Sequence, residues 1–205
     1  MIDKSVKKII KYGKIAGKKG MTPGISGNIS ARCGQQVVIT ATSTANGYLD
    51  EDDFAIIDME GNQVNSGKKA SSEKFLHLEF YRKRSDINAI FHVHSPYLTA
   101  FACAGIELGE YVSPEIIYCF DKIPLAGYAL PGSKELVDKT SIFFDNYDVI
   151  MMQNHGVIVG GKDVKDAYLK LELCEEYAKT IICAKFLGGA KILSEEQVNS
   201  ILSLR

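Results

Sequence analysis

Several features that define other classes of protein are missing from this sequence of 205 residues. No apolar run is long enough to cross a bilayer, and no N-terminal segment has the apolar core of a signal peptide. The chain also lacks a linker, an internal repeat and a low-complexity tract. These absences argue against a membrane protein and against a chain of several domains. We therefore expect one domain that spans residues 1–205.

The cysteines lack the pattern of a disulfide-rich or zinc-finger protein. There are five of them, widely spread and without any CxxC pair. An odd, scattered set argues against a disulfide framework and predicts a reducing compartment, so we expect a cytoplasmic protein. Small buried thiols explain these cysteines better than metal ligands do.

An excess of charge of one sign is absent as well. The chain has 24 basic and 25 acidic residues and a formal net charge of −1 at pH 7. No global field therefore favours nucleic acid or an anionic membrane, and we expect neither as a partner. The lysine-rich segment 4–19 alternates with Val6, Ile9, Ile10 and Ile15. This spacing predicts the solvated face of an amphipathic helix rather than a nucleic-acid patch.

What the chain does contain is an alternation of helical and strand patterns. Hairpins with few βαβ crossovers predict an α/β fold: a single-domain, three-layer α/β/α arrangement whose largely antiparallel central sheet is flanked by helices. Helices are expected over residues 5–17, 71–84, 96–104, 133–146, from 163 to about 187, and from 194. Strands are expected over residues 28–31, 36–40, 54–58, 62–64, 88–94, 116–118, 123–125, 149–153 and 157–159.

Three of the four histidines lie in two short apolar segments. His92 and His94 are two residues apart on an expected strand, so both side chains project from the same face. Burying two imidazoles side by side is costly unless both are satisfied, and one shared metal ion satisfies both. His155 follows another apolar strand and could converge on the same site, although a simple turn histidine has the same spacing. Three imidazoles and one carboxylate would complete a tetrahedral site for a metal such as zinc.

Polar loops provide candidate anion-binding groups. Ser71 and Ser72 open a helix, where the dipole favours an anion, although helix capping is the simpler explanation. The glycine-rich segment 24–30 and the hydroxyl-rich segment 40–44 could approach a ligand closely, but each alone is also an ordinary polar loop. His77 shares a helix face with the residue four positions before it, where a packed or exposed histidine is more common than a ligand.

The order of these motifs resembles that of the class II aldolase/adducin family. The motifs are SGNIS at 26–30, a Thr/Ser-rich turn at 40–44, SSE at 71–73, HVHSP at 92–96, and NHG at 154–156 before a long helix. The resemblance covers almost the whole chain. Within the family, the motifs look most like those of L-fuculose-1-phosphate aldolases.

The resemblance implies a metal-dependent lyase. A zinc ion, or another divalent metal, would be held by Glu73, His92, His94 and His155. The substrate would be a small ketose 1-phosphate, similar to L-fuculose 1-phosphate, cleaved to dihydroxyacetone phosphate and a short aldehyde such as lactaldehyde, with Glu73 as the base. The substrate phosphate would be bound by Gly27, Asn28, Thr42, Ser43, Ser71 and Ser72.

The resemblance further implies a homotetramer whose active sites lie at subunit interfaces. In the aldolases, a tyrosine of a neighbouring subunit protonates the aldehyde oxygen, and Tyr111 is the first candidate here. Glu115 or Tyr118 is the alternative, and Glu115 would fit a dehydratase or decarboxylase relative better. The aldolases also carry a second tyrosine near the C-terminus, whereas residues 201–205 contain none.

Other members of the family remain alternative interpretations. These are a sugar-phosphate epimerase, a dehydratase, a decarboxylase and a non-catalytic adducin-type module. The epimerases carry aspartate where this chain has Glu73, which favours aldol cleavage. The adducin-type members lack the complete ligand set, so the complete set here argues against a purely structural role.

Overall fold

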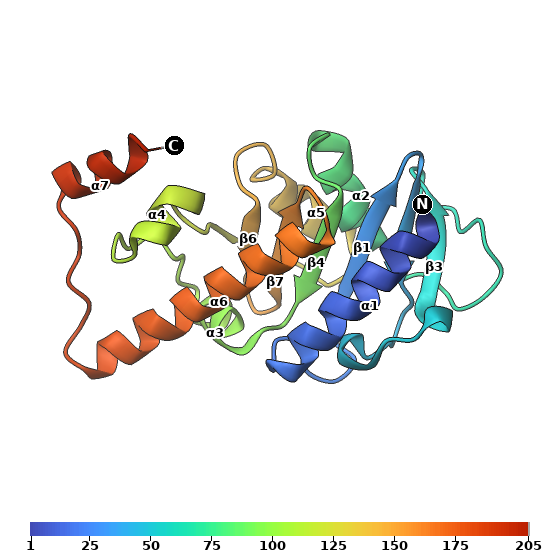
Figure 1. Cartoon of the computed structure of the whole chain (residues 1–205), viewed down its shortest axis with the longest axis horizontal. Helices are drawn as coiled ribbons and strands as arrows, with labels where there is room; N and C mark the ends of the chain where they lie inside the picture. Colours follow the sequence, from blue (N-terminus) through green and yellow to red (C-terminus); the bar gives the residue numbers. More distant parts are fainter. Residues whose placement is uncertain (205) are drawn as a thin grey trace.

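The computed structural model describes residues 1–204 and arranges them around one mixed β-sheet (Figure 1). Within the described residues, seven strands follow the order β3-β2-β1-β4-β7-β6-β5. Neighbouring strands are antiparallel except for β5, which runs parallel to β6 at one edge. The prediction of a largely antiparallel sheet is therefore confirmed. The strands are β1 (Asn28–Cys33), β2 (Gln36–Thr40), β3 (Phe54–Asp58), β4 (Ala89–Val93), β5 (Leu125–Ala126), β6 (Val149–Met152) and β7 (Gly156–Gly161).

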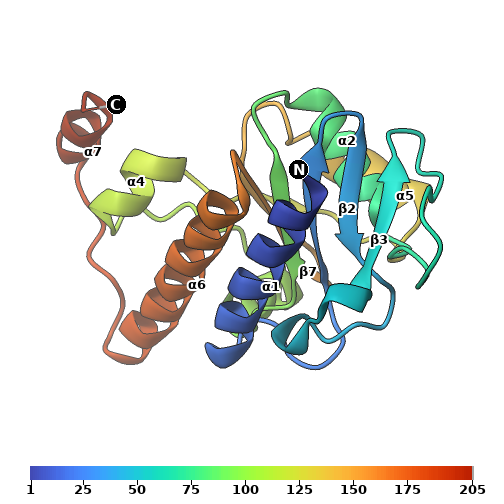
Figure 2. The ribbon, with the colours of Figure 1, turned by 45° about the vertical axis from the view of Figure 1, so that its right-hand side comes forward.

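Helices cover both faces of the sheet, as the sequence predicts. In Figure 2, α1 and α6 lie together in front of the sheet, whereas α2 and α5 lie behind it. The helices are α1 (Ile2–Lys18), α2 (Lys74–Lys83), α3 (Pro96–Ala104), α4 (Pro114–Phe120), α5 (Lys134–Ser141), α6 (Val164–Phe186) and α7 (Glu195–Leu202), with short 3-10 turns at Asn46–Tyr48 and Glu51–Asp53.

The core has two parts because alternate residues of a strand face opposite sides of the sheet. Phe91 and Val93 of β4 pack with apolar residues of α1, α3 and α6. Ile90 of the same strand packs on the other side with apolar residues of α2 and α5. His92 shares the face of Ile90, so this histidine points toward the layer of α2. The central strand thereby places the imidazole of His92 between sheet and helix.

The lysine-rich N-terminus forms the amphipathic helix that its spacing predicts. Ile9, Gly13 and Ala16 form the buried face of α1, while most of the lysines of this helix are exposed. Among residues 1–204, no helix combines the length and the apolar character needed to cross a membrane.

Two of the short strand predictions are wrong. Residues 116–118 lie in α4, where Ser113 and Pro114 begin a helix instead of a strand. A short apolar run does not distinguish a strand from a buried turn of helix, and a proline at the first helical position favours the helix. Residues 62–64 form no named strand, and Gln63 makes only an isolated bridge to Ile57.

The edge strand and two helices are shorter than predicted. The strand expected at 123–125 is found at Leu125–Ala126, and the helix expected over 133–146 ends at Ser141. The helix expected over 71–84 is found at Lys74–Lys83, so its N-cap residue is Glu73 and neither Ser71 nor Ser72. Beyond α6, the chain continues to α7, which lies beside α4 and away from the sheet (Figure 1).

Candidate metal centre

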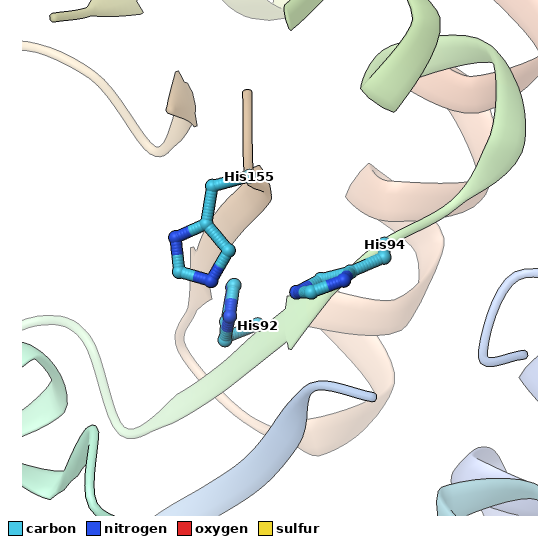
Figure 3. Close-up of side chains that lie close together, drawn as sticks. All are labelled: His92, His94 and His155. Atoms are coloured by element: carbon cyan, nitrogen blue, oxygen red, sulfur yellow. The ribbon is translucent and has the colours of Figure 1, made fainter. Parts of the chain in front are cut away.

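Three histidines meet where β4 ends and β7 begins, in the middle of the sheet (Figure 3). His92 is the fourth residue of β4, His94 directly follows that strand, and His155 lies in the turn between β6 and β7. β4 pairs with β7, which brings the end of one segment beside the start of the other. One ligand atom from each histidine lies within 4.8 Å of those of the other two.

A carboxylate completes the group. Glu73, directly before α2, has its Oε2 atom 3.0 Å from Nε2 of His92 and its Oε1 atom 3.3 Å from Nε2 of His155. Its side chain is largely buried, and His92 is fully buried. Side chains from three separate segments of the sequence therefore gather in one place.

Glycine allows the backbone segments to approach this closely. A Cβ atom at Gly156 would lie 2.5 Å from the carbonyl oxygen of Val93 and 2.7 Å from Cδ2 of His94. A Cβ atom at Gly27 would lie 2.3 Å from the carbonyl oxygen of His92, and Gly27 also has a φ of +74°. Any side chain at either position would push on a histidine segment.

Hydrogen bonds orient Glu73 and His92. Asn28 lies opposite His92 in the β1–β4 register, and its Nδ2 donates to Oε2 of Glu73 over 3.0 Å. Nδ1 of His92 lies 3.1 Å from the carbonyl oxygen of Val157. A donor on Nδ1 leaves Nε2 as the ligand atom, which is the usual support of a metal-binding imidazole.

The electrostatics of the group favour an ionised carboxylate and neutral imidazoles at His94 and His155, whereas His92 is shifted toward its protonated form. Burial opposes ionisation of Glu73, but His92, His155 and Asn28 together outweigh it and lower its pKa. Burial, and then His92, lowers the pKa of both His94 and His155 to about 4. Burial also acts to lower the pKa of His92, but the carboxylate of Glu73 reverses the effect and raises it.

The donor set fits a divalent transition metal. Three imidazoles and one carboxylate form the nitrogen and oxygen set that zinc accepts. In the described chain, the buried Nε2 atom of His94 has no hydrogen-bond partner. A buried polar atom without a partner is costly, and a cation at the centre of the group would satisfy it.

The candidate phosphate ligands lie in segments beside Glu73. Ser71 is buried, and its Oγ accepts a hydrogen bond from the backbone N–H of Glu73, whereas Ser72 is exposed. The backbone N–H of Thr42 donates to the carbonyl of Lys69, so the turn at 42–43 runs beside the start of α2. Asn28 faces Glu73 rather than an open loop.

Tyr111 lies just before α4, and Glu115 lies in the first turn of that helix. The Tyr111 hydroxyl donates to Oδ1 of Asp121 over 2.9 Å, and Glu115 accepts a hydrogen bond from Ser113 over 3.1 Å. Among the contacts of residues 1–204, none joins either side chain to the three histidines. The chain by itself therefore does not bring these two residues to the metal centre.

One buried polar chain beside the site is not predicted by the sequence. His77 is fully buried, with Nδ1 2.7 Å from Oγ of Ser30, which also lies 2.7 Å from the hydroxyl of Tyr81. His77 is thus a packed histidine. The alternation of Asn28 and Ser30 along β1, two polar residues on the face of His92, is the signal that could have revealed it.

The chain is similar to known proteins over most of its length. The family model for the class II aldolase and adducin N-terminal domain matches residues 7–182. An L-fuculose phosphate aldolase of Methanocaldococcus jannaschii is 42% identical over 76% of this chain and 83% of the relative. A 5-deoxy-D-ribulose 1-phosphate aldolase of Bacillus thuringiensis is 32% identical over 98% of this chain and 95% of the relative.

Other relatives carry a different activity, and a solved structure shares the fold. A 3-oxo-tetronate 4-phosphate decarboxylase of Haemophilus influenzae is 32% identical over 94% of this chain and 93% of the relative. A solved L-fuculose 1-phosphate aldolase superimposes with a TM-score of 0.90 at 29% identity, covering 98% of this chain and 95% of that chain.

Proposed function

We propose that this chain, which belongs to the class II aldolase and adducin family, cleaves a small ketose 1-phosphate. The substrate we favour resembles L-fuculose 1-phosphate, and its products are dihydroxyacetone phosphate and a short aldehyde such as lactaldehyde. One observation carries this proposal: Glu73 lies within 3.3 Å of two histidines in a group of three. Relatives named as aldolases of two ketose 1-phosphates support the substrate class.

The proposed metal ligands are Glu73, His92, His94 and His155, and the proposed ion is zinc or another divalent metal. When bound, such an ion supplies a Lewis acid that stabilises negative charge on the substrate oxygens. The imidazoles of His94 and His155 need no deprotonation at neutral pH to bind it, because their pKa values are lowered to about 4.

Glu73 is the proposed base. In the condensation direction, its carboxylate takes the proton from the carbon next to the substrate carbonyl, and in cleavage it returns that proton. The hydrogen bond from Asn28 to Oε2 orients the carboxylate. A lowered pKa keeps Glu73 ionised at neutral pH.

The substrate phosphate is proposed to bind where the polar loops adjoin Glu73. The turn at 42–43 runs beside the start of α2, and the backbone at Gly27 lies against His92. Holding the phosphate there fixes the reacting carbon near Glu73. The proposed phosphate ligands are Gly27, Asn28, Thr42, Ser43, Ser71 and Ser72.

The catalytic acid is proposed to come from a neighbouring subunit of a homotetramer. Tyr111 is the first candidate and Glu115 the second. The local contacts of both residues near α4 support a role outside their own chain's metal centre. We further propose that residues 1–205 form one domain, and that the enzyme works in the cytoplasm, as the odd number and scattered positions of its five cysteines suggest.

The test combines metal analysis with a product assay. The purified protein is expected to bind one divalent ion per chain and to release dihydroxyacetone phosphate from L-fuculose 1-phosphate. Glu73→Gln should lower turnover by roughly 100-fold or more, because it removes the base. Glu79→Gln is the matched control and should leave turnover unchanged, because the half-buried Glu79 pairs with Arg82 on the same helix. A wild-type protein that binds no divalent metal would refute the proposal.

A decarboxylase is the second candidate. The relative from Haemophilus influenzae is named as a decarboxylase, and it matches this chain over nearly its whole length. Carbon dioxide release from 3-oxo-tetronate 4-phosphate, without dihydroxyacetone phosphate from any ketose 1-phosphate, would favour it. An epimerase or dehydratase would convert a sugar phosphate without releasing either product. A metal-binding protein with no turnover on all of these substrates would instead favour a non-catalytic module.

A further inference from the structure

Glu175 is a buried carboxylate that no step of the proposed reaction uses. It lies in the middle of α6, and only 7% of the residue is exposed. Oε2 accepts hydrogen bonds from Oγ of Ser95 over 2.7 Å and from the backbone N–H of Leu98 over 3.0 Å. Oε1 accepts one from the backbone N–H of Tyr97 over 2.8 Å. Three hydrogen bonds to one buried carboxylate fix the position of Glu175 relative to the segment that donates them.

These donors belong to the first turn of α3. Ser95 is the N-cap residue of this helix, yet its own side chain makes no capping bond. The carboxylate of Glu175 takes the place of that cap from a different helix. A negative charge is favourable at a helix N-terminus, where free N–H groups and the helix dipole converge. Glu175 thus ties the start of α3 to α6.

Helix α3 in turn connects the two histidine segments. Its N-cap residue directly follows His94. Near its other end, the carbonyl oxygen of Ala102 accepts a hydrogen bond from the backbone N–H of Asn154 over 3.2 Å, and Asn154 directly precedes His155. A displacement of this short helix would therefore move both His94 and His155.

We propose that Glu175 is a positioning residue of the metal centre, acting through α3. This inference rests on the proposed function, because it assumes that His94 and His155 bind a metal. A cap supplied by α3 itself would stabilise the helix but leave its position on α6 free to vary. A cap supplied by α6 fixes that position, and with it the separation of two ligand atoms. Residues that orient metal ligands change metal affinity when they are replaced.

The test is the zinc affinity of Glu175→Gln, measured by competition with a chromophoric chelator. A glutamine accepts hydrogen bonds at only one of the two places where Glu175 has an oxygen, so its amide nitrogen faces an N–H or hydroxyl donor. Zinc affinity should fall by roughly 10-fold to 100-fold. Turnover should recover in excess zinc, because the ligands themselves are intact. Ser95→Ala removes one of the three hydrogen bonds and should give a smaller loss of affinity in the same direction.

Ser133→Ala is the matched control. Ser133 caps α5 through a hydrogen bond from the backbone N–H of Leu136 over 3.1 Å, and it contacts none of the proposed ligands. This variant should lower the melting temperature without changing zinc affinity. If Glu175→Gln and Ser95→Ala lower only the melting temperature, as Ser133→Ala does, the positioning role is wrong while the proposed metal site stands. If the wild-type protein binds no divalent metal, both proposals are wrong.

Discussion

At the scale of single residues, the geometry of the proposed metal centre depends on a glycine as much as on the proposed ligands. Gly156 follows His155, and its Cα faces the segment that carries His94. We expect Gly156→Ala to destabilise the protein by about 1–3 kcal/mol, the usual cost of an extra carbon in a packed site. Zinc affinity should also fall, because the new Cβ would lie 2.7 Å from Cδ2 of His94 and must displace it. Urea unfolding and chelator competition measure the two effects.

Gly109→Ala is the control for this substitution. A Cβ atom there would meet only Cβ of Lys122, at an ordinary contact distance of 3.7 Å. Its effect on the free energy of unfolding should stay within about 0.5 kcal/mol. Equal behaviour of the two alanine variants would mean that the close approach at Gly156 does not constrain the histidines.

The pairing of His92 with His94 could be predicted from residue spacing, but the approach of His155 to these two histidines could not. The separation of His92 and His94 places both on one side of the chain, and their ring centroids lie 5.2 Å apart. His155 is as plausible in an isolated turn, and only the pairing of β4 with β7 brings it to the other two. That pairing depends on contacts between segments about 65 positions apart, such as that of His92 with Val157, which no local pattern encodes.

At the scale of elements, α2 is held at its C-terminal end by one side chain of β1. The guanidinium of Arg32 donates to the carbonyl oxygens of Tyr81 over 2.9 Å, and of Ser85 and Ile87 over 2.6 Å each. Free carbonyl groups at a helix end need donors, and a cation there also complements the helix dipole. Because α2 begins next to Glu73, this anchor contributes to the orientation of the proposed base.

We expect Arg32→Met to lower the free energy of unfolding by about 2 kcal/mol, the scale of a few hydrogen bonds to a charged donor. For a protein of this size, that change corresponds to a fall in melting temperature of roughly 4–8 °C. Lys134→Met is the control, because Lys134 is exposed and its pairing with Asp138 over 2.8 Å lies within one helix. Such pairs contribute about 0.5 kcal/mol or less. If the two variants had the same melting temperature, the guanidinium of Arg32 would not be an anchor of α2.

Elements with strong end signals were predictable, and short apolar ones were not. The capping box of Ser194 and Gln197 opens α7 as the sequence predicts. By contrast, Ile116 and Ile117 are both buried, a pattern that suits a strand and a single buried turn of helix alike. Burial in that segment is decided by its tertiary contacts with α7 and α6, and these lie outside any local window.

At the scale of the whole molecule, the residues proposed to act between chains are the hardest to predict. Tyr111 and Glu115 were singled out by resemblance alone, and within one chain they contact Asp121 and Ser113 instead of the histidines. A sequence pattern reports what one chain buries when it folds. It contains no periodic signal for a side chain whose partner belongs to another copy.

Burial in the folded protein favours the neutral form of three histidines, His77, His94 and His155. Burial, and then the neighbouring His92, lowers the pKa of His77 from its ordinary 6.5 to about 3. The pKa values of His94 and His155 are lowered to about 4. The unfolded chain therefore binds protons below about pH 6.5 that the folded protein does not bind. Stability is greatest above that pH and falls as the pH drops toward the folded values. His92, whose pKa is raised, has the opposite sign, and its contribution is complete below pH 6.5.

His77→Gln should make the metal-free protein less sensitive to acid. Each neutral histidine contributes a slope of up to about 1.4 kcal/mol per pH unit between its two pKa values. Removing His77 should therefore reduce proton uptake on unfolding by close to one proton between about pH 5 and pH 6. Urea unfolding in the presence of a chelator measures this slope.

Tyr81→Phe breaks the same chain of hydrogen bonds through Ser30 but removes no group that titrates in this range. It should lower stability at every pH and leave the slope unchanged, whereas an unchanged slope in His77→Gln would show that His77 is not the buried neutral group described.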